Sequence, residues 1–123
     1  MLSKVTIVEV GPRDGFQMEP AFIPTEVKVQ IINQISRAGI RKIETTSFVH
    51  PNVIPQLRDA REVLEQIERV PGVCYLALVP NLRGAQNALD AGVDAVKVVL
   101  AVTESSNQKN IRMSVNESLR TTE

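Results

Sequence analysis

The chain has 123 residues, a length typical of a single domain. Its 14 basic and 14 acidic side chains balance to a formal net charge of +0, so it lacks the basic excess of nucleic-acid-binding proteins. A hydrophobic fraction of 43% argues against disorder, and no apolar run is long enough to predict a membrane-spanning helix. We therefore expect a globular protein that binds neither nucleic acid nor membrane.

The cysteine content and the first residues bear on the compartment. The chain has one cysteine, Cys74, which cannot form an internal disulfide, as is usual in a reducing compartment. Neither a secretory signal nor an Arg-rich transit segment precedes the first apolar run. These features predict a cytoplasmic protein.

Short apolar strands alternate with amphipathic helices along the chain. We predict strands at residues 5–10, 41–46, 73–79 and 95–102. We predict helices at residues 24–38, 56–69 and 82–91, with Asn81 as the cap of the last one. A capping box, Ser114 to Glu117, opens a further helix toward Glu123. Loops are expected at residues 11–23, at 47–55 and around Lys109 and Asn110.

This alternation predicts right-handed βαβ units, and hence an α/β fold with a parallel sheet. A glycine, which favours the end of a helix, stands in each predicted helix-to-strand turn: Gly39, Gly72 and Gly92. The loops after the first, second and fourth strands are longer and more polar than these turns. We therefore expect the functional residues at the carboxyl ends of the strands.

The segment that follows the first strand carries the strongest chemical pattern. It reads Gly11-Pro12-Arg13-Asp14-Gly15-Phe16-Gln17. Asp14 offers a hard oxygen ligand for a divalent cation, and Arg13 is suited to stabilise negative charge that develops in a reaction. A surface Arg-Asp pair in a turn is the alternative, because Gly, Pro and Asp are common in turns.

Residues at the end of the second strand complete the candidate site. Glu44 lies in an apolar run, and a buried carboxylate needs a partner, which Arg13 on the neighbouring strand can supply. That pair is either functional or purely structural. Gln17 and Ser47 offer hydrogen bonds to a substrate, although hydroxyl groups at strand ends often bind only the backbone. His50 is expected at the surface, and Cys74 as a small buried apolar residue.

The segment Gly11–Gln17 resembles the opening motif of 3-hydroxy-3-methylglutaryl-CoA lyases, metal-dependent enzymes built on a TIM barrel. Further blocks of the same family occur in order at residues 43–49, 55–56, 80–84 and 109–111. Since such a barrel needs about 250 residues, the resemblance implies that residues 1–123 form the amino-terminal half of one barrel domain, with about four strands.

The resemblance also implies an activity: cleavage of 3-hydroxy-3-methylglutaryl-CoA, or a related 3-hydroxyacyl-CoA, to acetyl-CoA and a keto acid. Mg²⁺ or Mn²⁺ would be the cofactor, with Asp14 as one ligand and the others in the missing half. Arg13 would hold an enolate and Glu44 would orient Arg13. Met18 stands where these lyases usually have asparagine, which leaves the acyl group open.

Two other functions stay open, together with the partners. One is a synthase or carboxyltransferase of the same superfamily, which shares the Arg-Asp-Gly core. The other is a non-catalytic half-barrel that works as an assembly module. Exposed strand edges predict a homo-oligomer, such as a dimer, or associated half-barrels, and the isolated chain is expected to be inactive.

Overall fold

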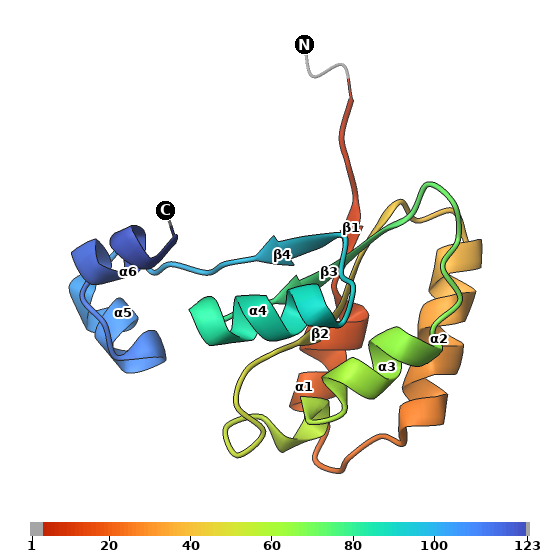
Figure 1. Cartoon of the computed structure of the whole chain (residues 1–123), viewed down its shortest axis with the longest axis horizontal. Coiled ribbons are helices and arrows are strands. Elements are labelled where there is room, and N and C mark those ends of the chain that lie inside the picture. Colours follow the sequence, from red (N-terminus) through yellow and green to blue (C-terminus); the bar gives the residue numbers. More distant parts are fainter. Residues whose placement is uncertain (1–3, 123) are drawn as a thin grey trace.

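The computed structural model describes residues 4–122 and has the predicted α/β fold (Figure 1). One parallel sheet has the strand order β1-β2-β3-β4, with strands Val8–Glu9, Lys42–Ser47, Cys74–Leu78 and Ala95–Lys97. Six α-helices connect or follow them: α1 Phe16–Met18, α2 Thr25–Arg37, α3 Ala60–Gln66, α4 Leu82–Asp90, α5 Glu104–Ile111 and α6 Val115–Thr122. Sequential parallel neighbours are the arrangement expected of βαβ units.

The core lies between the sheet and the helices that connect its strands. Ile43 of β2 and Tyr75 of β3 pack with Ile32 of α2 and with Val63 and Leu64 of α3. Because successive side chains of a strand point to opposite faces, the residue after Ile43 projects away from these helices. The sequence of β2 thus puts an apolar side chain into the core and Glu44 on the other face of the sheet.

The predicted helix-to-strand turns and caps are confirmed. Gly39, Gly72 and Gly92 all have positive φ angles, which side chains with a Cβ rarely adopt. The Asn81 side chain accepts a hydrogen bond from the Gly84 N–H at the start of α4. In the capping box, hydrogen bonds from Ser114 lower the pKa of Glu117 below its ordinary value, the backbone N–H contributing most.

The prediction of a loop over residues 11–23 was partly wrong. Gly11–Gly15 form a single π-helical turn, which continues directly into α1. Pro12, which has no N–H to leave unpaired, suits the first turn, and the Val10 carbonyl accepts hydrogen bonds from the Arg13 and Asp14 N–H groups. The motif is therefore held in a compact turn, which fixes where its side chains point.

Several other boundaries were also wrong. β1 and β4 are shorter than the predicted strands, because β1 pairs with β2 only at Val8 and Glu9 and β3 ends opposite Lys97. A short 3₁₀ turn, Pro55–Leu57, precedes α3, which ends at Gln66. The loop expected around Lys109 and Asn110 is helix α5, capped by the Thr103 hydroxyl. The predicted end of the last helix at Glu123 lies outside the described residues.

A buried ion pair fastens the segment after the motif to α3. The Lys28 ammonium lies 2.6 Å from Asp59 Oδ1 and 2.5 Å from the Gln56 carbonyl oxygen. The Thr25 hydroxyl donates to the other oxygen of Asp59 at 2.7 Å. The Lys28 ammonium and the Arg58 guanidinium both contact the Phe22 ring, at 4.1 and 3.6 Å from its centre. These contacts connect the start of α2 to the start of α3.

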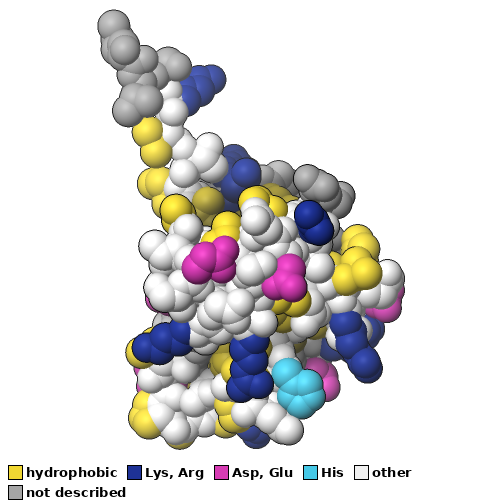
Figure 2. Space-filling model, turned by 90° about the vertical axis from the view of Figure 1, so that its left-hand side faces the viewer, with side chains coloured by type: hydrophobic (Ala, Val, Ile, Leu, Met, Phe, Trp, Pro, Cys, Tyr) yellow, Lys and Arg dark blue, Asp and Glu magenta, His cyan; other side chains and the backbone are white. Residues whose placement is uncertain are grey.

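Apolar side chains remain exposed at the first edge of the sheet. Val5, Ile7 and Val8 are all exposed, and Figure 2 shows hydrophobic side chains on the segment that leads into β1. Figure 1 shows the same segment standing clear of the helices. No helix among the described residues has the length and hydropathy of a membrane span.

We expect the substitution Lys28→Met to lower the free energy of unfolding by about 3 kcal/mol, because the buried Asp59 carboxylate would lose its counter-ion. Urea unfolding followed by circular dichroism measures this loss. Lys42→Met, which removes an exposed lysine, is the control and should change the value by less than about 0.5 kcal/mol. Equal losses in the two variants would contradict the role of the buried pair.

Candidate functional site

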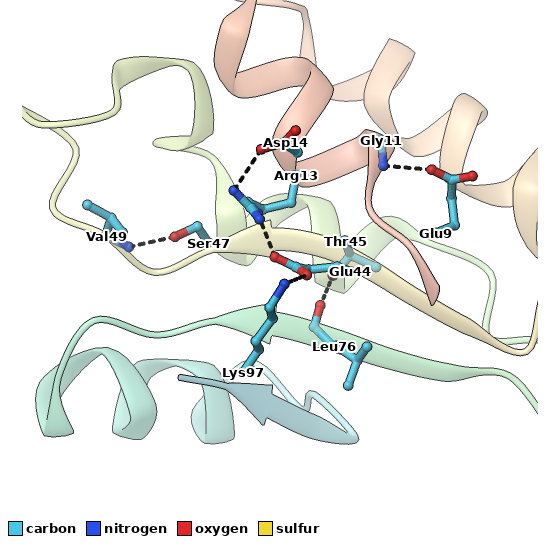
Figure 3. A network of polar contacts seen from close by, with 10 residues as sticks. All are labelled: Glu9, Gly11, Arg13, Asp14, Glu44, Thr45, Ser47, Val49, Leu76 and Lys97. Atoms are coloured by element: carbon cyan, nitrogen blue, oxygen red, sulfur yellow. Dashed lines mark hydrogen bonds and ion pairs between the residues drawn. The ribbon is translucent and has the colours of Figure 1, made fainter. Parts of the chain in front are cut away.

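Arg13 and Glu44 form a close ion pair at the carboxyl side of the sheet (Figure 3). The Arg13 Nε–H donates to Glu44 Oε1 at 2.5 Å. The Glu44 side chain is 0% exposed and the Arg13 side chain 14% exposed. The predicted proximity of these two residues is therefore confirmed, and the short charge-assisted contact holds the guanidinium in a defined orientation.

The turn around the motif explains why Arg13 points at β2. The π-helical turn Gly11–Gly15 packs against β2, and Pro12 is its buried residue. The Gly11 N–H donates to Glu9 Oε1 at 2.7 Å, so the end of β1 and the start of the turn are tied together. An added Cβ at Gly11 would lie 2.9 Å from that carboxylate oxygen, so a larger residue here would require the end of the Glu9 side chain to move.

Asp14 lies beside Arg13 but faces solvent. Its Oδ1 atom is 3.1 Å from Arg13 Nη1, and its side chain is 61% exposed. Its other carboxylate oxygen accepts no hydrogen bond from residues 4–122 and is therefore open to a cation. No group of three or more His, Cys, Asp or Glu side chains that could hold a metal ion occurs in the described part of the chain. Asp14 is thus one suitable ligand, not a complete metal site.

Lys97 is a member of the site that the sequence analysis missed. Its ammonium, at the end of β4, lies 2.8 Å from Glu44 Oε2 and its side chain is 42% exposed. A charged residue inside the apolar run 95–102 was a usable signal, because a lysine in such a strand needs a partner. The sheet order places β4 two strands away from β2, and the long lysine side chain spans that distance.

Besides Arg13, the residues predicted to bind substrate are Gln17 and Ser47, and these two differ in their surroundings. The Ser47 hydroxyl is buried and accepts a hydrogen bond from the Val49 N–H at 3.2 Å, which is the backbone alternative weighed for it. Gln17 lies on α1, and its Oε1 atom is buried without a hydrogen-bond partner among the described residues. Such an unpartnered acceptor is uncommon in folded proteins, so it points to a donor outside residues 4–122.

The remaining candidates stay outside the site. His50 is exposed, as predicted, and its Nδ1 accepts a hydrogen bond from the Asn52 N–H. Cys74 was predicted to be buried but is half-buried at the start of β3, on the amino side of the sheet. Neither residue contacts Arg13, Asp14 or Glu44.

The geometry defines a class of fold. Parallel βα units whose charged side chains, a buried carboxylate, a paired guanidinium and an open carboxylate, gather at the carboxyl side of the sheet are typical of α/β proteins. The sequence profile of the HMGL-like family matches residues 4–123. The chain belongs to the HMGL-like family.

Individual relatives agree with this assignment. The chain is 56% identical over 116 residues to hydroxymethylglutaryl-CoA lyase YngG of Bacillus subtilis, covering 94% of this chain and 39% of that protein. It is 49% identical to the cytoplasmic 3-hydroxy-3-methylglutaryl-CoA lyase of Rattus norvegicus, again over 94% of this chain but 34% of that protein. The chain thus spans less than half the length of these relatives.

Solved structures confirm the fold. The crystal structure of the Bacillus subtilis HMG-CoA lyase superposes with a TM-score of 0.92 at 55% identity, over 96% of this chain and 40% of the other. An HMG-CoA lyase from Acinetobacter baumannii, solved with coenzyme A and 3-methylmalate, gives 0.91 at 41% identity, over 95% and 38%. The four-stranded sheet corresponds to the amino-terminal part of these TIM barrels.

A double-mutant cycle tests whether Arg13 and Glu44 act as a unit. With Arg13→Met and Glu44→Gln, we expect a coupling free energy of about 1–3 kcal/mol from urea unfolding, because the pair is almost fully buried. The exposed pair Arg37 and Glu68, substituted in the same way, is the control and should couple by less than about 1 kcal/mol. A coupling at Arg13 and Glu44 no larger than the control would contradict a tightly held pair.

Proposed function

We propose that this chain supplies the amino-terminal part of one barrel domain of a divalent-metal-dependent carbon–carbon lyase, whose substrate is 3-hydroxy-3-methylglutaryl-CoA or a related 3-hydroxyacyl-CoA. The observation that supports this most is the Arg13–Glu44 pair, because it fixes a guanidinium inside the very motif by which the chain resembles these lyases. Identities of 56% and 49% to proteins named as such lyases support the same substrate class.

The reaction breaks the bond between C2 and C3 of the acyl chain. A base takes the proton of the C3 hydroxyl, C3 becomes a ketone, and the bonding electrons pass to C2 and the thioester oxygen as an enolate. Protonation at C2 then gives acetyl-CoA beside acetoacetate or a related keto acid. The base and the proton donor are proposed to lie outside residues 4–122, because Asp14 is assigned to the metal and Glu44 is already bound by Arg13 and Lys97.

Arg13 is proposed to stabilise the negative charge on the thioester oxygen. Its Nε–H is directed at Glu44 and its Nη1 group at Asp14, while its Nη2 group makes no hydrogen bond within residues 4–122. A fixed donor of this kind stabilises developing charge more effectively than a mobile one, because little reorganisation is needed during the reaction. Glu44 is proposed to act through Arg13, as the group that orients it.

Asp14 is proposed as the ligand for Mg²⁺ or Mn²⁺ in this part of the protein. An exposed carboxylate with one open oxygen is the donor that both ions favour, and further ligands must come from elsewhere. When bound, such an ion acts as a Lewis acid toward the oxygens of the substrate. Arg13 also holds Asp14 by one oxygen, which keeps its carboxylate beside the guanidinium.

Gln17 and Ser47 are proposed to bind the substrate. The buried, unpartnered Oε1 atom of Gln17 favours a hydrogen bond from the substrate or from the rest of the barrel. Ser47 can donate its hydroxyl hydrogen, since in its hydrogen bond with the Val49 N–H the hydroxyl oxygen is the acceptor. An acyl-CoA partner is supported by the relative that was solved with coenzyme A.

Assembly and location are part of the proposal. Exposed apolar residues at the β1 edge favour association, either as a homo-oligomer or with the remaining part of a barrel. We propose a cytoplasmic location, although relatives include proteins named as mitochondrial as well as cytoplasmic. A synthase or carboxyltransferase function is less well supported, since the relatives cited above are all named as lyases.

The roles of Asp14 and Arg13 can be distinguished in a protein with a complete barrel. This protein, called the completed protein, joins the chain to the part of the Bacillus subtilis relative that the chain does not match. Asp14→Asn should weaken Mn²⁺ binding at least about tenfold and lower turnover by orders of magnitude, because a charged ligand is lost. Arg13→Met should leave Mn²⁺ affinity nearly intact and lower kcat about 10²- to 10³-fold.

Calorimetric titration with Mn²⁺ and an assay of acetyl-CoA formation measure these two effects. Lys42→Met, which changes an exposed residue at the amino end of β2, is the control and should resemble the unsubstituted protein in both. Unaltered cleavage of 3-hydroxy-3-methylglutaryl-CoA in both site variants would refute the assigned roles.

The 123-residue chain alone should not cleave 3-hydroxy-3-methylglutaryl-CoA at any Mn²⁺ concentration. At the site, the described residues offer one metal ligand and no closed pocket around Arg13 from which water is excluded. Mass-verified chain and the completed protein, assayed side by side for acetyl-CoA, provide the comparison. Metal-dependent turnover by the chain as a monomer would show that the groups assigned to the rest of the barrel are not needed.

A further inference from the structure

The carboxylate of Glu44 is shared by two cations, one on each oxygen. Arg13 Nε occupies Oε1 at 2.5 Å, and Lys97 Nζ occupies Oε2 at 2.8 Å (Figure 3). These contacts come from three separate parts of the fold: the π-helical turn after β1, the middle of β2 and the end of β4. The side chain between them is 0% exposed, so water cannot replace either donor.

This arrangement makes Lys97 more than a surface charge. If Arg13 were the sole partner, Oε2 would be a buried oxygen without a donor, and the carboxylate could rotate about its terminal bond. The Lys97 contact fixes that rotation from the opposite side and so presents Oε1 to Arg13. The orientation of the guanidinium therefore depends on a residue of β4 that belongs to none of the motifs noted in the sequence.

The charge balance of the site also points to Lys97. Glu44 and Asp14 both lie beside Arg13, so without Lys97 these side chains would carry a net negative charge, which Lys97 brings to zero. A site that stabilises an enolate oxygen gains from this balance, because a net negative charge at the strand ends would oppose the developing anion. The partly exposed Lys97 ammonium provides this balance without taking Arg13 away from Glu44.

We propose that Lys97 is a positioning residue of this site: it holds the Glu44 carboxylate so that Glu44, in turn, holds the Arg13 guanidinium in place. The catalytic consequence rests on the proposed lyase function, while the positioning itself does not. Lys97 is assigned no contact with the substrate.

Nuclear magnetic resonance on the 13.6 kDa chain tests the positioning without any assay of activity. The ¹⁵N-bound proton at Arg13 Nε, assigned by its loss in Arg13→Met, should exchange slowly with water because it is donated to a buried oxygen. Lys97→Met should speed this exchange at least about tenfold, since a charge-assisted hydrogen bond that holds Glu44 is lost. Lys97→Arg should restore slow exchange, and Lys42→Met should not alter it.

In the completed protein the same variants separate positioning from binding. Lys97→Met should lower kcat about tenfold while KM changes less than about twofold. The reason is that a loosened guanidinium stabilises the charge of the transition state less well, whereas binding of the uncharged thioester in the ground state depends little on it. Lys97→Arg should recover most of kcat. Should Lys97→Met fold poorly, Lys97→Gln, which replaces the charge-assisted hydrogen bond by at most a neutral one, should change kcat in the same direction by a smaller factor.

The outcomes distinguish the two proposals. Unchanged Arg13 exchange in Lys97→Met, or failure of Lys97→Arg to restore it, would overturn the positioning role. Fast exchange in Lys97→Met together with an inactive unsubstituted completed protein would support the positioning role and count against the lyase function. A rise in KM with kcat unchanged would also overturn the proposal, because it would make Lys97 a binding residue.

Discussion

The buried carboxylate of Glu44 is the constraint on which the site depends. A carboxylate that is 0% exposed is unfavourable unless both of its oxygens have partners, and here Arg13 and Lys97 supply them. The partners come from the turn after β1 and from β4, so the requirement fixes these elements relative to β2. Glu44, on the face of the sheet opposite the core, thereby holds together the charged side chains at which the chemistry is proposed.

The packing of the core also determines where Glu44 points. Ile43, next to Glu44, is buried among apolar residues of α2 and α3, which settles the face to which Glu44 points. The Lys28–Asp59 pair and the stacking around Phe22 then hold the segment between the motif and α2. The start of α2 therefore has a fixed position, while the hydrogen bond from the Gly11 N–H to Glu9 ties the start of the π-helical turn to the end of β1.

The sequence allowed the parallel α/β fold, the turns and the Arg13–Glu44 contact to be predicted, because these follow from hydrophobic period, glycine placement and strand adjacency. It did not show the π-helical turn, in which the Arg13 and Asp14 N–H groups donate to the Val10 carbonyl and the Phe16 N–H donates to the Gly11 carbonyl. It also did not show Lys97, since a contact that reaches from β4 to β2 depends on the direction of a long side chain. The shortness of β4 likewise depends on its neighbour, β3, which ends at Leu78.

A crystal structure of the completed protein soaked in Mn²⁺, with the metal located by its anomalous scattering, would test the assigned roles of Asp14, Arg13 and Glu44 most directly. We expect one Mn²⁺ ion bound to the open oxygen of Asp14, at about 2.0–2.2 Å, the range of such ions in octahedral oxygen sites. We also expect Arg13 to remain paired with Glu44, and Glu44 with Lys97. Mn²⁺ bound away from Asp14, or an Arg13 side chain that has left Glu44, would contradict these roles.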